Sequence, residues 1–150
     1  MAPSHALLLV LASLSAAALA CGRPASEQPD IPEAAVFDQT LQRDLESYFT
    51  KADSGPIHVA FELVSDQPII SGIAYPKYCV WVEVRSGERL VRVGAARVTA
   101  INKSFKVTDF LPAETINNDP QSVARVFPAE LVGDLTKRAH GASQTPKRGV

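Results

Sequence analysis

The chain has 150 residues, of which 46% are hydrophobic and 21% are charged, as is usual for one globular domain. This length suffices for a core that folds without metal ions or disulfide bonds. The formal net charge is -1, which excludes the strong global field that a nucleic-acid partner would require. We therefore expect no nucleic-acid partner.

The chain begins with an uncharged apolar run from Ala6 to Ala20. The run is shorter than the ~20 apolar residues that cross a membrane, but it fits the apolar region of a secretory signal peptide. Ala18 and Ala20 supply small residues at the two positions that a signal peptidase reads. No Lys or Arg precedes the run, which indicates a weak leader or a start codon farther upstream. We predict that residues 1–20 are a signal peptide; a buried core helix is the alternative.

The four residues 18–21, Ala-Leu-Ala-Cys, resemble the lipobox of bacterial lipoproteins, although Leu is commoner than Ala at its first position. The resemblance implies cleavage before Cys21, acylation of this cysteine, and a membrane anchor with the several acyl chains that stable attachment needs. Residues 21–32 would form a lipidated tether. Gly22 is not the Asp of an inner-membrane retention signal, which favours the outer membrane. The alternative is a soluble periplasmic or secreted protein cut at the same bond.

A helix is predicted first in the mature chain, starting with the capping-box pattern at 30–33 or at Asp38 and ending at the turn residues 53–56. Its apolar residues recur at helical spacing and should pack on a sheet. These are Phe37, Leu41, Leu45, Tyr48, Phe49 and Ala52. The residues off this stripe should face water: Asp38, Gln42, Arg43, Glu46 and Lys51.

Alternating apolar and polar residues predict strands at 57–63, 78–85, 90–103 and 105–111, with a short extended segment at 69–70. Turn residues at 86–88 and 102–104 should join the last three strands into hairpins. The apolar phase changes within the third of these strands, and Gly94 lies at the change. We therefore predict a β-bulge at Gly94, which would bend the sheet.

The end of the chain returns to a helical pattern. Asp119 and Pro120 predict the start of one short helix, and Pro128 predicts the start of another that Gly141 should end. Residues 142–150 lack an apolar pattern, so we expect a mobile tail after a single domain at 33–141.

The predicted fold class is α+β: an N-terminal helix packed on a curved antiparallel sheet of four to five strands, followed by short C-terminal helices. This order of elements resembles cystatin-like and NTF2-like folds, in which a helix lies in the hollow of a bent sheet. The resemblance does not select a function, because such folds include inhibitors, small-molecule binders and enzymes.

Four residues are candidates for a binding surface: Tyr75, Lys77, Trp81 and Arg85. Tyr75 belongs to the segment before a strand, and the other three share one face of that strand. Trp and Arg are common interface anchors. The interpretation that we favour for Trp81 is a core residue beneath the C-terminal helices.

Three residues could form an enzymatic site in the hollow of the sheet: His58, Glu62 and Glu83. A Cys79–His58 pair is a further possibility for nucleophilic catalysis. Cys79 lies in an apolar strand, however, where a lone thiol is usually a buried and unreactive packing group.

The sequence contains no Gly-x-Ser-x-Gly, Cys-x-x-Cys or glycine-rich phosphate-loop motif, and we predict no metal site and no cofactor. Our hypothesis is a cell-envelope lipoprotein whose non-enzymatic domain binds a protein or small ligand, as an inhibitor or immunity protein would. A periplasmic enzyme and a structural envelope component are the alternatives.

Overall fold

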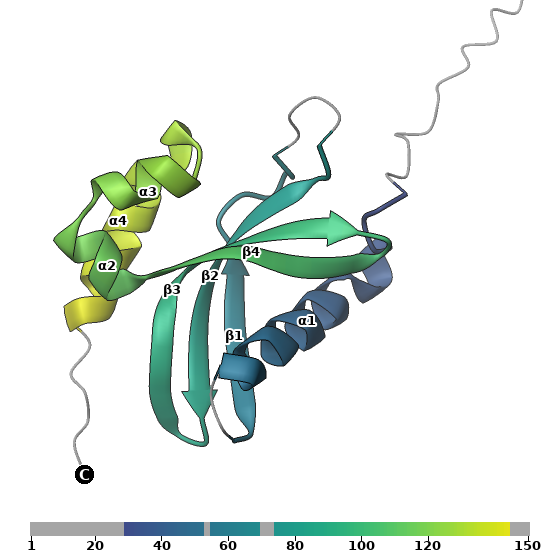
Figure 1. Ribbon diagram of the computed structural model, residues 1–150, viewed down its shortest axis with the longest axis horizontal. Coiled ribbons are helices and arrows are strands. Elements are labelled where there is room, and N and C mark those ends of the chain that lie inside the picture. Colours follow the sequence, from purple (N-terminus) through teal and green to yellow (C-terminus); the bar gives the residue numbers. More distant parts are fainter. Residues whose placement is uncertain (1–28, 53–54, 70–73, 145–150) are drawn as a thin grey trace, which may run out of the picture.

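The computed structural model describes residues 29–52, 55–69 and 74–144. The predicted signal peptide and Cys21 lie outside these ranges. The described residues form an N-terminal helix, a four-stranded antiparallel sheet in the order β1-β2-β3-β4, and a group of C-terminal helices (Figure 1). The predicted α+β fold is confirmed.

The elements have these bounds: the 3-10 turn η1 Ala34–Val36, α1 Phe37–Ala52, β1 Ile57–Leu63, β2 Lys77–Ser86, β3 Arg89–Ile101, β4 Ser104–Pro112, α2 Ala113–Asn118, α3 Gln121–Val126 and α4 Ala129–Gln144. The two predicted hairpin turns are present, with positive φ angles at Gly87 (60°), Asn102 (49°) and Lys103 (61°). Positive φ at both central residues of the β3–β4 turn matches the twist of a two-residue hairpin. Ile69 pairs with Lys77 in an isolated bridge, whereas Ile70 lies outside the described residues.

Helix α1 begins at Phe37, later than the capping-box pattern predicted. Glu33 makes no side-chain cap hydrogen bond. The Asp30 carboxylate instead accepts a hydrogen bond from the Asn102 backbone N–H (3.0 Å), and the Asp30 carbonyl accepts one from Lys103 N–H (3.0 Å). Asp30 therefore connects the N-terminal segment to the β3–β4 turn through hydrogen bonds. A local sequence pattern cannot predict this contact, because the two segments are far apart in the chain.

Helix α1 packs on one face of the sheet and buries most of the predicted stripe. Leu41 and Leu45 are fully buried, as is the ring of Phe49, which packs edge-on against Phe110 at 5.1 Å between ring centres. Phe37 is half-buried, whereas Tyr48 is 40% exposed, contrary to the prediction; the burial of Ala52 lies outside what the structure describes. The buried strand residues in the core cluster beneath α1 are Val59, Tyr78, Val80, Val82, Val84, Ala96, Val98, Ala100 and Phe105. Each large side chain buried here contributes about 1.5–3 kcal/mol to stability.

The C-terminal helices cover part of the opposite face, so the sheet lies between α1 and the group α2–α4 (Figure 1). Cys79, Trp81 and Ala95 from the strands pack there against Phe127 and Leu135 from the helical segment. Trp81 is only 8% exposed. The interpretation of Trp81 as a core residue beneath these helices is confirmed.

Helix α4 continues to Gln144, so the prediction that Gly141 ends it is wrong. Tertiary contacts hold its last turns, because Asn117 Nδ2 donates hydrogen bonds to the Ala139 carbonyl (3.0 Å) and to Ser143 Oγ (2.5 Å). The donor belongs to α2, a helix that the sequence patterns did not predict. Residues 145–150 of the predicted mobile tail lie outside the described residues.

A β-bulge is present in β3, but not at Gly94, and it accounts for only part of the phase change: Val91 packs on the α1 face with Ala96, whereas Val93 packs on the opposite face beneath the C-terminal helices. Val84 pairs with Arg92 and Arg85 with Leu90, which leaves Val91 as the extra residue. A second irregularity in the β3–β4 ladder leaves Thr108 unpaired in register. The two bulges accompany the bend of the sheet around α1 (Figure 1).

Gly94 has a different role: because it has no side chain, the end of β4 can pack close to β3. A Cβ atom at Gly94 would lie 2.3 Å from the Leu111 carbonyl oxygen and 2.9 Å from Pro112 Cα. Both atoms belong to the backbone, so β4 would have to move away from β3 to accommodate a side chain. A Cβ atom at Gly133 in α4, by contrast, would meet no heavy atom within 4 Å beyond its chain neighbours and the backbone of its own helix.

We predict that Gly94→Ala lowers the free energy of unfolding by about 1–3 kcal/mol, the usual cost of overpacking. The matched control, Gly133→Ala, should raise it by about 0.5–1 kcal/mol, because alanine replaces glycine inside a helix at an open position. Urea denaturation of the two variants and the parent chain measures both effects. Equal effects of the two substitutions would contradict the close approach of β4.

Candidate functional site

The polar side chains of α1 reach both edges of the sheet. Gln42 Nε2 donates a hydrogen bond to the Val59 carbonyl (2.5 Å), and Glu46 Oε1 accepts one from Val59 N–H (3.3 Å). On the opposite edge, Asp44 Oδ2 accepts a hydrogen bond from Phe105 N–H (2.7 Å). The prediction that Gln42 and Glu46 face water is therefore wrong. They satisfy backbone groups of β1 that no neighbouring strand can reach.

The carboxylate of Glu46 is partly buried, which raises its pKa, but three hydrogen-bond partners together lower the pKa below its ordinary value. These partners are Gln42, Val59 N–H and His58, whose Nδ1 lies 3.1 Å from Glu46 Oε1. The charged form of the Glu46 carboxylate is thus favoured where α1 packs against β1.

The structure separates His58 from Cys79. His58 lies opposite Arg85, about 20 Å along β2 from Cys79. Burial raises the pKa of the fully buried Cys79 thiol to about 12, which keeps it protonated. The buried thiol is confirmed, and the proposed catalytic pair is wrong because strand register sets the two residues apart.

The four candidate surface residues do not form one exposed patch. Tyr75 is 50% exposed before β2, and Lys77 begins β2 with backbone hydrogen bonds to Ile69 (2.7 and 3.1 Å). Arg85 lies about 25 Å away at the other end of β2. The buried Trp81 lies between them.

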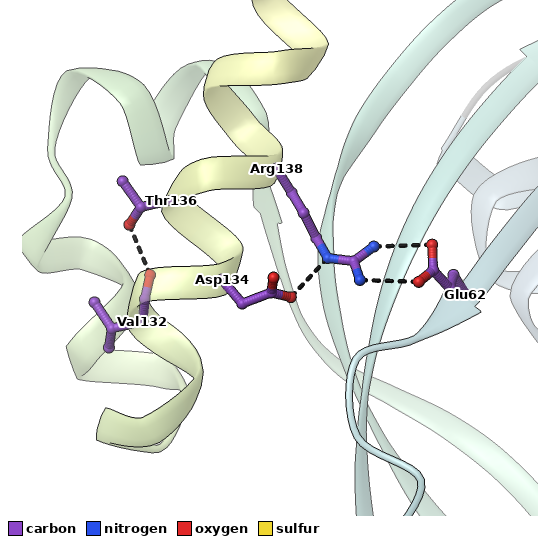
Figure 2. Close-up of polar contacts among 5 residues, drawn as sticks. All are labelled: Glu62, Val132, Asp134, Thr136 and Arg138. Atoms are coloured by element: carbon purple, nitrogen blue, oxygen red, sulfur yellow. Dashed lines mark hydrogen bonds and ion pairs between the residues drawn. The ribbon is translucent and has the colours of Figure 1, made fainter.

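Arg138 connects α4 to β1 on the face opposite α1. Its guanidinium donates two parallel hydrogen bonds to the Glu62 carboxylate (2.9 Å each) and one to Asp134 Oδ2 (2.7 Å), as Figure 2 shows. The hydrogen bond and charge of Arg138 lower the pKa of Glu62, and the hydrogen bond to Glu62 raises the pKa of Arg138. Such a bidentate pair fixes orientation as well as distance.

Arg97 makes the corresponding connection on the β4 side. Its Nε donates a hydrogen bond to Asp109 Oδ2 (2.8 Å), and its Nη1 donates one to the Val126 carbonyl (2.8 Å). The two arginines thus connect the C-terminal helices to the sheet at two points, one on β1 and one on β3.

The structure does not place the hypothetical enzymatic residues in the hollow of the sheet. Core side chains around Leu45 and Phe49 fill that space. Glu62 and Glu83 have the opposite strand parity and border a small cavity of about 220 Å³ beside Trp81. This prediction is therefore wrong in its location.

An open groove of about 850 Å³ lies between the N-terminal segment and the loop after β1. Phe37, Leu63 and Tyr78 contribute apolar surface, and burial raises the pKa of the Tyr78 phenol. The other apolar lining residues are Ile31, Pro32, Ala34, Ala35 and Pro68. We refer to this site as the N-terminal groove.

The polar lining of the N-terminal groove is mostly acidic. Glu33, Asp38 and Asp66 are exposed, whereas Lys103 is the cation among the lining residues. No salt bridge among the described residues involves any of the three carboxylates. Sequence reasoning missed this site, because its walls come from distant segments that only the fold brings together.

Two further observations concern the described residues alone. They contain no group of three or more His, Cys, Asp or Glu side chains that could hold a metal ion. None of the helices in these ranges has the length and apolar character of a membrane-spanning segment.

Comparisons of the chain with protein-family models, curated proteins and solved structures gave no match in any of the three cases. The functional argument therefore depends on the residues and geometry of this chain.

We predict that the Glu62–Arg138 pair makes stability depend on pH. Because folding lowers the pKa of Glu62, the pair stabilises the fold above the ordinary value of 4.5 and loses this contribution as pH falls through the folded-state pKa. At neutral pH, Glu62→Gln should lower the free energy of unfolding by about 0.5–1 kcal/mol, as expected for an exposed pair.

Urea unfolding of the parent chain and Glu62→Gln at neutral pH and at about pH 3 measures this difference. Glu88→Gln, which removes an exposed turn carboxylate outside the described salt bridges, is the control. A difference between the parent and Glu62→Gln that stays constant with pH would contradict the assignment.

Proposed function

We propose that the protein is a lipid-anchored cell-envelope protein whose domain acts without catalysis, by binding a partner in the N-terminal groove. The groove is the observation that carries this proposal. Its volume of about 850 Å³ falls within the range of ligand sites, and it combines apolar surface with a few charged groups.

Packing around the groove supports a preformed site. Phe37 packs edge-on against Tyr78 (5.2 Å between ring centres) and Phe105 (4.9 Å). Asp30 is fastened to the β3–β4 turn by its two hydrogen bonds. A wall that is ordered before binding lowers the entropic cost of association.

The position of the groove also agrees with an anchored protein. An extended chain spans about 3.3–3.6 Å per residue, so Asp30 lies within about 30 Å of Cys21. Ile31 lines the groove. If Cys21 carries the acyl chains that the lipobox-like residues 18–21 imply, the groove opens close to the membrane, with the outer membrane favoured by Gly22. We therefore expect a partner at the membrane surface or in the adjoining periplasm.

The anchor is tested by Cys21→Ser. This substitution should release the protein from the membrane fraction or leave the leader uncleaved, and it should abolish metabolic labelling with a fatty acid. Fractionation and labelling of the parent chain and the variant measure both effects. An unlabelled parent chain with an unchanged membrane fraction in the variant would contradict the lipid anchor.

The groove is tested by site-specific photo-crosslinking in cells. A photoreactive residue at Ala35, which lines the groove, should capture a partner, and Ala34→Trp should abolish capture by filling the groove. Leu90, which is 40% exposed in β3, provides the control position. Capture of the same partner from Tyr75 but not from Ala35 would contradict binding in the groove and would place the contact at the segment before β2.

A further inference from the structure

The N-terminal groove continues into an open stretch of the β1 edge. β1 is an outer strand, and Val64 N–H at its end bonds to the Cys79 carbonyl on β2 (2.9 Å). Val59, of the opposite parity, directs its N–H and carbonyl to α1. In an antiparallel pair, the backbone N–H and carbonyl groups of successive residues point alternately toward the partner strand and away from it. Phe61 and Leu63 have the same parity as Val59, so their backbone groups also point away from β2.

The hydrogen bonds from α1 to the β1 edge end before this stretch. Gln42 and Glu46 satisfy both outward groups of Val59, but no hydrogen bond within the described ranges reaches the outward groups of Phe61 or Leu63. Proteins usually protect such an edge with a charged residue, a proline or a covering element. Apolar residues occupy both positions here, so the edge remains available for another strand.

The open backbone and the groove adjoin at Leu63, which lines the groove. A segment paired with Phe61 and Leu63 would direct alternate side chains toward the α1 side of the sheet, where the groove lies. Backbone pairing combined with pockets for alternate side chains is the general mode of peptide recognition by strand addition.

The charges around the groove select the kind of peptide. The three carboxylates of Glu33, Asp38 and Asp66 face one cation, Lys103, and have no salt-bridge partner among the described residues. This surface complements Lys or Arg side chains and disfavours acidic ones.

We propose, building on the binding function above, that the partner supplies an extended segment of alternating basic and apolar residues. This segment adds to β1 at Phe61–Leu63 and directs its basic side chains, which alternate with the apolar ones, into the groove, where their methylene stems contact the apolar walls and their cations reach Asp38 and Asp66.

The probe is a fluorescent eight-residue peptide of alternating Lys and Val, with both ends blocked. Three comparisons use the same full chain: a peptide of alternating Glu and Val, the Lys-Val peptide with alternate amides N-methylated, and the unmodified probe. The Lys-Val peptide should bind, as measured by fluorescence anisotropy, and should slow hydrogen exchange at the Phe61 and Leu63 amides. N-methylation should weaken binding about tenfold or more, because several backbone hydrogen bonds are lost.

Substitutions in the chain test the same contacts from the other side. Asp38→Asn and Asp66→Asn should each raise Kd about twofold to fivefold, the range of an exposed ion pair, whereas Glu88→Gln should leave Kd unchanged. Leu63→Pro removes one outward N–H without removing a bond to β2, so it should raise Kd while preserving the fold. The N-methylated peptide tests the pairing independently if this variant fails to fold.

Equal binding of the N-methylated and unmodified peptides would overturn strand addition. Failure of the Lys-Val peptide to bind, or preference for the Glu-Val peptide, would overturn the basic partner. If the partner is captured from Ala35 while the Lys-Val peptide does not bind, the proposed function stands and this inference fails. If neither occurs, both fail.

Discussion

A four-stranded open sheet has two edges whose outward backbone groups need partners, and α1 supplies partners at one residue of each edge. Asp44 binds Phe105 on β4, while Gln42 and Glu46 bind Val59 on β1. The sheet must bend for one helix to reach both edges, and the β-bulges in its two hairpin ladders accompany that bend. The apolar stripe of α1 then fills the hollow, so edge protection and core packing are two results of a single arrangement.

The opposite face of the sheet is covered through apolar contacts and arginine hydrogen bonds. Trp81 and Cys79 are buried by the C-terminal helices through apolar contact, which has little directionality. Arg138 and Arg97 add direction, because each joins a helix group to a strand through hydrogen bonds of defined geometry. These two arginines therefore have a structural role on this face.

The proposed binding site arises where the hydrogen bonds from α1 to the β1 edge end. The helix satisfies the β1 edge at Val59, and beyond it the edge at Leu63 adjoins the N-terminal groove. Backbone donors and acceptors, apolar surface and carboxylates that form no salt bridge within the described part of the chain meet there. A lipid anchor at Cys21 would hold this site near the membrane, which is the link between the predicted leader and the domain.

The sequence alone determined the elements whose signals are local. The period of Leu41, Leu45 and Phe49 predicted α1, strict alternation predicted the strands, and turn residues predicted both hairpins, because these patterns follow from backbone geometry. Tertiary structure decided the strand register, which separates His58 from Cys79. It also decided that Gln42 and Glu46 bind the edge strand β1. The close approach of β4 to Gly94 and the bulge at Val91 likewise depend on how the strands pair. Tertiary structure also decided the groove, since Phe37, Leu63 and Tyr78 are distant in the chain and meet only when α1 packs on the sheet. Periodicity specifies which side of an element is apolar, whereas the partner of each polar group depends on the approach of another element.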